Sequence, residues 1–171
     1  MTRLEIILYK DTEHASGGAI KNSHIATKIV DDKTGEDFYF SWGYNVGKNF
    51  NSELNKYKNK ATDDCPLIYQ VLSIPVNKKF SELKETVERS KYNDKNESYK
   101  PYSLLQNNCA SCTIDILKFS GLDIIDQYFT SLNSFLFHLP ETVFEKATEM
   151  AKQNYPDSKE ERHRFPLPSR P

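Results

Sequence analysis

Cys109 is the residue of this sequence best placed to do chemistry. It follows two turn-forming asparagines, Asn107 and Asn108, and precedes an amphipathic stretch that stops at Gly121. This pattern predicts a helix that starts at the cysteine. The partial positive charge at a helix N-terminus stabilises a thiolate and lowers the pKa of a thiol. Unpaired backbone N–H groups at the same place can bind a developing oxyanion, so one piece of backbone would supply both the nucleophile and its oxyanion donors.

His24 is the residue that we expect to act as the base for this thiol. It opens a predicted strand over residues 23–30, where the backbone would hold the ring rigidly. The other three histidines stand in a polar loop, directly before a proline-started helix and in the C-terminal segment. A single histidine is most often a surface residue or a satisfied core residue. Here a second feature, the predicted helix-borne thiol, independently requires a base.

Several predicted elements position these two residues. Strands are predicted over 4–10, 23–30, 37–42 and 66–76, with the second and third forming a β-hairpin. Helices are predicted over 77–91, 109–120 and 139–154, and residues 122–137 are irregular but apolar. The polar stretch 43–64 is either a flexible insertion or carries a short helix near 53–60. Together they predict one domain of residues 1–155, followed by a flexible tail, rich in proline and charge, at 156–171.

The composition gives no electrostatic reason to bind nucleic acid or an anionic membrane. The 171 residues are 37% hydrophobic and 27% charged, and the formal net charge is -1. No stretch approaches the roughly 20 apolar residues that span a bilayer, and residues 1–10 are too charged for a signal peptide. The cysteine count is odd, which argues against a disulfide framework. We therefore expect a reducing compartment: the cytoplasm, or a host cell reached without a cleaved signal.

The chain resembles the circularly permuted papain-like thiol hydrolases of the NlpC/P60 superfamily. The resemblance rests on SHIATKI at 23–29, YFSW at 39–42, YSL at 102–104, NCAS at 108–111, Gly121 and LPETVF at 139–144. In that group, which includes lecithin:retinol acyltransferase-like enzymes and cysteine domains of bacterial toxins and effectors, the histidine strand precedes the cysteine helix. The resemblance implies an α+β, papain-like fold in which an antiparallel sheet packs against a cysteine-bearing helix.

The resemblance also implies a role for each motif residue. Cys109 would be the nucleophile and His24 the base, and backbone N–H groups with Asn108 would hold the oxyanion. Independently of the resemblance, the many aromatic residues are mostly expected to form strand faces and core, but Tyr39 and Trp42 could line a substrate groove. The reaction would be hydrolysis or acyl transfer at an amide, isopeptide or (thio)ester of a protein, a peptide or a lipid, with no cofactor and no metal. A translocated bacterial effector is one setting that fits.

The third catalytic residue of this group commonly lies on the strand after the histidine. That region offers Asp37, Ser41 and, just beyond the strand, Asn45. If the hairpin pairs about the centre of its turn, His24 lies opposite Gly43, so Ser41 and Asn45 are the nearest polar side chains. We favour Ser41 because it lies within the strand.

Two alternatives compete with the thiol hydrolase. Cys109 and Cys112 form a CxxC pair, as in thiol redox proteins, but the spacing places Cys112 on the same side of the helix as Ile116 and Phe119, which predicts an inert core thiol. Zinc would need two more ligands at a suitable spacing, and Cys65 is isolated. The second alternative is a non-catalytic papain-like module that binds a partner through its aromatic groove.

Overall fold

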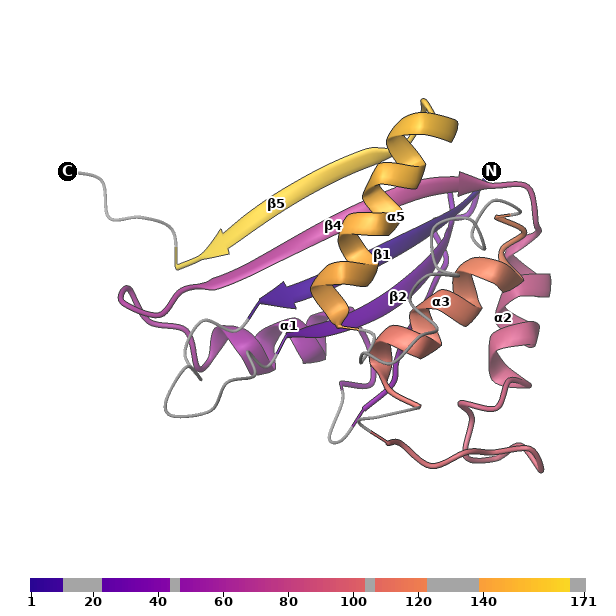
Figure 1. The fold of residues 1–171 in the computed structure, drawn as a ribbon, viewed down its shortest axis with the longest axis horizontal. Helices are drawn as coiled ribbons and strands as arrows, with labels where there is room; N and C mark the ends of the chain where they lie inside the picture. Colours follow the sequence, from indigo (N-terminus) through magenta and orange to yellow (C-terminus); the bar gives the residue numbers. More distant parts are fainter. Residues whose placement is uncertain (11–22, 44–46, 104–106, 123–138, 167–171) are drawn as a thin grey trace.

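The computed structural model describes residues 1–10, 23–43, 47–103, 107–122 and 139–166. They form a five-stranded antiparallel sheet in the order β3-β2-β1-β4-β5 (Figure 1). The strands are β1 (Thr2–Lys10), β2 (His24–Asp31), β3 (Asp37–Ser41), β4 (Leu67–Val76) and β5 (Lys159–Phe165). The first strand of the chain lies at the centre of the sheet, and β3 and β5 are its edges.

The hairpin of β2 and β3 has the register predicted from the sequence. Ala26 lies opposite Ser41, so the pairing is centred on the turn at 31–36. Within that turn the Gly35 N–H donates to the Asp31 carbonyl at 2.8 Å. Gly35 has a φ of 72°, a left-handed conformation that glycine adopts without steric cost. The turn therefore fixes which residues of β3 lie near the start of β2.

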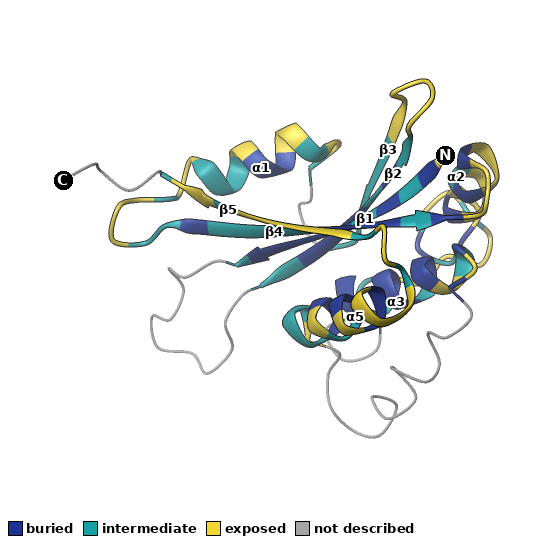
Figure 2. Ribbon diagram, turned by 90° about the horizontal axis from the view of Figure 1, so that it is seen from above, coloured by how far each residue is buried: buried dark blue, intermediate teal, exposed yellow. Residues whose placement is uncertain are grey.

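Helices cover both faces of the sheet. The described helices are α1 (Phe50–Lys58), α2 (Phe80–Glu88), α3 (Cys109–Phe119) and α5 (Pro140–Asn154). The last three pack against one face and α1 lies on the other (Figure 2). The larger hydrophobic core lies between the sheet and α2, α3 and α5, and a smaller cluster lies beneath α1. The fold is thus α+β with helices on both sides. No helix in the described ranges is long and apolar enough to cross a membrane.

The cysteine-bearing helix begins and ends as predicted. Cys109 is the first residue of α3, and Gly121 follows its last turn with a φ of 78°. Helix α2 begins at Phe80 rather than directly after Asn77. The polar stretch after the hairpin carries a helix, α1, slightly earlier in the chain than the short helix considered from the sequence. The irregular segment predicted at 122–137 lies, apart from its first residue, outside the described residues.

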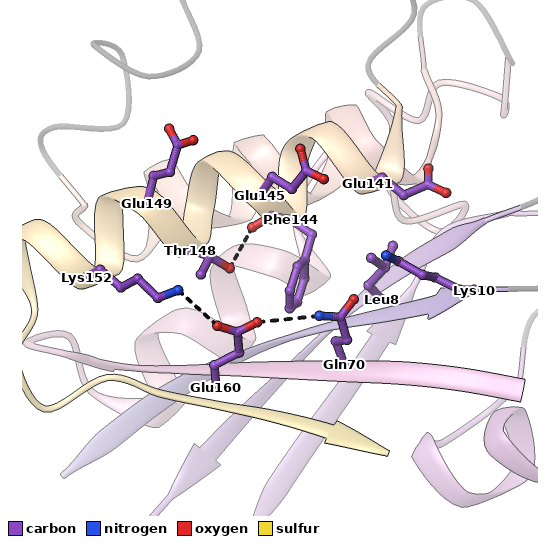
Figure 3. Close-up of a pocket in the computed structure, with 10 residues that line it drawn as sticks. All are labelled: Leu8, Lys10, Gln70, Glu141, Phe144, Glu145, Thr148, Glu149, Lys152 and Glu160. Atoms are coloured by element: carbon purple, nitrogen blue, oxygen red, sulfur yellow. Dashed lines mark hydrogen bonds and ion pairs between the residues drawn. The ribbon is translucent and has the colours of Figure 1, made fainter. Parts of the chain in front are cut away.

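The C-terminal segment differs from the expectation of a flexible tail at 156–171. Its first part contains β5, which pairs with β4 along its whole length. Figure 3 shows Glu160 of β5 between Lys152 of α5, at 3.3 Å, and Gln70 of β4, at 3.4 Å. Backbone pairing and cross-strand polar contacts hold this strand, and most of its side chains are exposed. Because it has no alternating apolar residues, hydrophobic periodicity could not reveal it.

Truncation of a core leucine should destabilise the fold strongly. Leu83 of α2 has no exposed surface, so Leu83→Ala is expected to lower the free energy of unfolding by about 2–5 kcal/mol. Leu139→Ala removes the same atoms from a side chain that is 47% exposed, and should cost far less. Urea unfolding followed by circular dichroism measures both. Equal losses would contradict the core assignment.

Candidate active site

The start of α3 is organised by a capping box around the candidate nucleophile. The Asn108 side-chain oxygen accepts a hydrogen bond from the Ser111 backbone N–H at 2.9 Å, and the Ser111 hydroxyl accepts one from the Asn108 N–H at 3.0 Å. The capping box does not use the backbone N–H groups of Cys109 and Ala110, the first two residues of the helix. Because the Asn108 oxygen is committed to the cap and an oxyanion needs donors, only the amide nitrogen of that side chain could contact an oxyanion.

The His24 ring, on the first residue of β2, contacts Ser41, Glu53 and Cys109. Its Nε2 lies 2.7 Å from Ser41 Oγ and 3.0 Å from Glu53 Oε1. The ring also interacts with the Cys109 thiol through a hydrogen bond that contributes to the pKa of His24. Burial alone would lower the pKa of His24. The hydrogen bonds to Cys109 and Glu53, with the negative charges of both, outweigh burial and raise the pKa to about 9.

The pKa of the Cys109 thiol is lowered, whereas that of His24 is raised. The residue is only 6% exposed, and burial by itself would raise the thiol pKa. The hydrogen bond to His24 and the positive charge of the ring lower the pKa below its ordinary value, and hydrogen bonds to the backbone at Ile25 and Ala110 add to this. The raised pKa of His24 and the lowered pKa of Cys109 together favour a thiolate–imidazolium pair, the reactive state of a cysteine nucleophile.

Glu53 is the member of the site that the sequence analysis missed. It lies in the first turn of α1 and is 1% exposed. Its carboxylate contacts the His24 ring, accepts from the Ser41 hydroxyl at 3.2 Å and from the Gly47 N–H at 3.1 Å, and is hydrogen-bonded by Tyr39. Burial would raise the pKa of Glu53, but these partners, His24 first, lower it. A buried, ionised carboxylate thus holds the imidazole at Nε2.

A sequence signal for Glu53 existed. It is the single acidic residue between Asp37 and Asp63, in a stretch otherwise rich in lysine and asparagine. It also shares a helical stripe with Phe50 and Leu54, the apolar residues that α1 turns toward the sheet. A lone acid on the apolar face of a short helix indicates a buried partner of opposite charge.

The structure brings Ser41 to the histidine but places the two candidate groove aromatics in different packing environments. Tyr39 packs in the cluster beneath α1, where its hydroxyl is 3.1 Å from that of Tyr9. Burial raises the pKa of both tyrosines, so they stay protonated. Trp42 packs against the larger core, and its indole N–H donates to the Asn107 carbonyl at 3.2 Å. Tyr39 therefore supports the carboxylate, whereas Trp42 borders the start of α3.

Cys112 is separated from this chemistry. It is 3% exposed, and burial raises the pKa of its thiol well above the ordinary value. Cys109 and Cys112 are both free thiols. Among the described residues, no group of three or more histidines, cysteines and carboxylates is arranged to hold a metal ion.

Removal of the Glu53 charge should weaken the ion pair. Glu53→Gln keeps the shape of the side chain, but a neutral amide no longer stabilises the imidazolium, so the pKa of His24 falls and that of Cys109 rises. Iodoacetamide alkylation of Cys109 at mildly acidic pH should slow by about tenfold or more. Glu85→Gln, on the exposed face of α2, is the matched control and should leave the rate unchanged. An unchanged rate in Glu53→Gln would contradict the role given to this carboxylate.

Comparisons of the chain with protein-family models, with curated proteins and with solved structures find no match.

Proposed function

We propose that the protein is a cysteine-dependent hydrolase or acyltransferase that works through a Cys109 acyl-enzyme. The observation that carries the proposal is the hydrogen-bonded chain from Cys109 through the His24 ring to the buried Glu53 carboxylate. Nucleophile, base and orienting group within hydrogen-bond reach of one another are the signature of an activated nucleophile. The order of a histidine strand before a cysteine helix also agrees with the resemblance to permuted papain-like enzymes, whose fold we propose for this chain.

The first half of the reaction forms the acyl-enzyme. The Cys109 sulfur attacks the substrate carbonyl carbon, and the carbonyl π electrons move onto oxygen. The Cys109 N–H, at the positive end of α3, is placed to stabilise that oxyanion. The intermediate collapses, the bond to the leaving amine, alcohol or thiol breaks, and His24 gives its proton to the leaving group. A thioester on Cys109 remains.

The second half returns the enzyme to its starting state. Water, or an acceptor amine or alcohol, attacks the thioester carbonyl while neutral His24 takes its proton. The carbon–sulfur bond breaks and the thiolate re-forms beside the imidazolium. Hydrolysis and transfer differ only in the acceptor, so the substrate class extends over amide, isopeptide and (thio)ester bonds of proteins, peptides or lipids. We place the reaction in a reducing compartment, the cytoplasm of the producing cell or that of a host, because such a compartment keeps thiols free of disulfides.

Glu53 and Ser41 serve as orienting residues in this proposal. The Glu53 carboxylate fixes the ring of His24 and stabilises its protonated form, as the acidic member of a catalytic triad does. The Ser41 hydroxyl bridges the ring and the carboxylate at 2.7 Å and 3.2 Å, so it restricts rotation of the imidazole. Ser41→Ala should therefore reduce activity less than Glu53→Ala.

Reactivity of Cys109 tests the proposed function directly. In the wild type, alkylation by iodoacetamide should show an apparent pKa well below the roughly 8.5 of a free thiol, and His24→Ala should abolish this shift. Cys112→Ser should leave it in place, because that thiol is buried and outside the site. Mass spectrometry of the alkylated peptide measures each rate. An ordinary thiol in all variants would point to the non-catalytic module, and a reversible Cys109–Cys112 disulfide would point to redox chemistry.

The pH dependence should follow the two members of the ion pair. Activity is expected to rise as Cys109 loses its proton on the acidic side, and to fall as His24 loses its proton near pH 9, because the leaving group then lacks an acid. The His24 ring resonances in NMR spectra should titrate at about 9. Cys109→Ser removes the thiolate that raises the pKa, so the titration should move to lower pH. A His24 pKa below its ordinary value of 6.5 in the wild type would contradict the ion pair.

A further inference from the structure

A pocket of about 470 Å³ lies directly beside the candidate site. Its walls come from the end of β3 and from the loop that follows α2, and they include Phe40, Trp42, Tyr92, Tyr99 and Tyr102. Ser41, which hydrogen-bonds to the His24 ring, also lines it. Neither His24 nor Cys109 is among the described residues that line the pocket, so Ser41 is its link to the candidate site.

The aromatic rings of this pocket meet at steep angles. The Trp42 indole lies 5.5 Å from the Tyr92 ring at 71° and 5.9 Å from the Tyr99 ring at 73°. Tyr92 is only 1% exposed, so the ring surface that a ligand could reach comes mainly from Trp42 and from Tyr99, which is 39% exposed. Aromatic rings that meet in a corner of this kind bind organic cations, because the face of each ring carries negative potential.

The charges around the pocket favour a cation as well. Among the described residues that line it, Asp94 is the charged one, and none of them is a lysine, arginine or histidine. The Asp94 carboxylate is exposed and has no hydrogen bond or ion pair with another described residue. Lys91 lies near the Tyr92 ring, 5.1 Å from its centroid, but its ammonium is paired with Asp115 at 2.8 Å. Lys95 and Lys100 lie on the same loop but outside the described lining, so the charge of the lining itself is that of Asp94.

One residue ties the pocket to the start of the catalytic helix. The Asn107 carbonyl accepts the Trp42 indole N–H, and the Asn107 side chain donates to the carbonyls of Lys100 and Pro101, both at 2.9 Å. Pro101 lines the pocket, and Asn107 stands two residues before Cys109. Asn107 thus fixes Trp42 on one wall of the pocket and Pro101 on the other relative to the candidate nucleophile.

We propose that this pocket binds an alkylammonium group of the acyl substrate, with the aromatic corner around Trp42 as the cation site and Asp94 as its counter-charge. The proposal rests on the proposed function for its link to catalysis, but binding can be measured without turnover. It narrows the substrate to carbonyl compounds that carry a primary or quaternary ammonium group close to the bond that is broken.

Trp42 is itself the probe, since the chain contains a single tryptophan. Its fluorescence should respond to titration of the Cys109→Ser variant with choline, and 3,3-dimethylbutan-1-ol, the neutral isostere of choline, should bind about tenfold more weakly. Butylamine, a primary ammonium, provides the second arm. Tighter binding of choline indicates a quaternary group in the natural substrate, and tighter binding of butylamine indicates a lysine-like group. Equal affinity for choline and its neutral isostere would overturn the proposal.

Matched variants separate the pocket from the rest of the surface. Asp94→Asn should weaken choline binding about two- to fivefold, and Asp63→Asn, an exposed acid elsewhere, should not. Tyr99→Ala should weaken it about three- to tenfold. Phe165→Ala removes a ring of similar exposure, 37% against 39%, and should have no effect. Binding that survives both Asp94→Asn and Tyr99→Ala unchanged would overturn the assignment to this pocket.

The two proposals fail in different ways. If Cys109 alkylates as an ordinary thiol while Trp42 still senses choline, the cation site stands and the enzyme proposal is wrong. If Cys109 is activated but Trp42 does not respond to any ammonium, the cation site is wrong and the enzyme proposal stands.

Discussion

The arrangement of the site depends on one constraint, the burial of the Glu53 carboxylate. A carboxylate removed from water must be paired and hydrogen-bonded, or its burial costs several kcal/mol. Glu53 meets this requirement with partners from β2, β3 and the segment before α1. Gly47 belongs to the same constraint, because a Cβ at that position would lie 2.5 Å from the Glu53 Cβ. One buried charge therefore explains four features of the site. They are the position of α1, the glycine at 47, the hydroxyl of Ser41 and the positive charge on His24.

This constraint makes the candidate site a property of the whole fold. His24 begins β2, Glu53 lies on α1 and Cys109 begins α3, so the three groups come from separate parts of the chain. None of them is activated by its neighbours in sequence alone. The helix N-terminus supplies the backbone donors, but the lowered pKa of Cys109 depends on a ring that a distant carboxylate keeps charged. A reactive Cys109 is therefore also a sign that sheet and helices have docked correctly.

Local signals predicted the parts of this structure that local physics determines. The Asn108 cap, the first residue of α3 and the glycine that ends it were accessible because capping and termination involve residues a few positions apart. The hairpin register was accessible because a short turn fixes it. The contact between Glu53 and His24 was not, since it joins a weakly periodic helix to a strand 29 positions earlier in the chain. The proximity of Ser41 to the histidine followed from the register, whereas its shared hydrogen bond with the carboxylate required α1 to be in place.

The exposed edge strand β5 has a further consequence for how the protein behaves in solution. No described strand pairs with its outer edge, so the backbone groups there could accept a strand from another chain. From Lys159 to Arg164 every residue carries a charge or is a histidine, with both signs present. A neighbouring chain that paired there would have to place its side chains against this mixed row and desolvate it. The composition that hid β5 from hydrophobic periodicity thus protects the sheet against edge-to-edge aggregation.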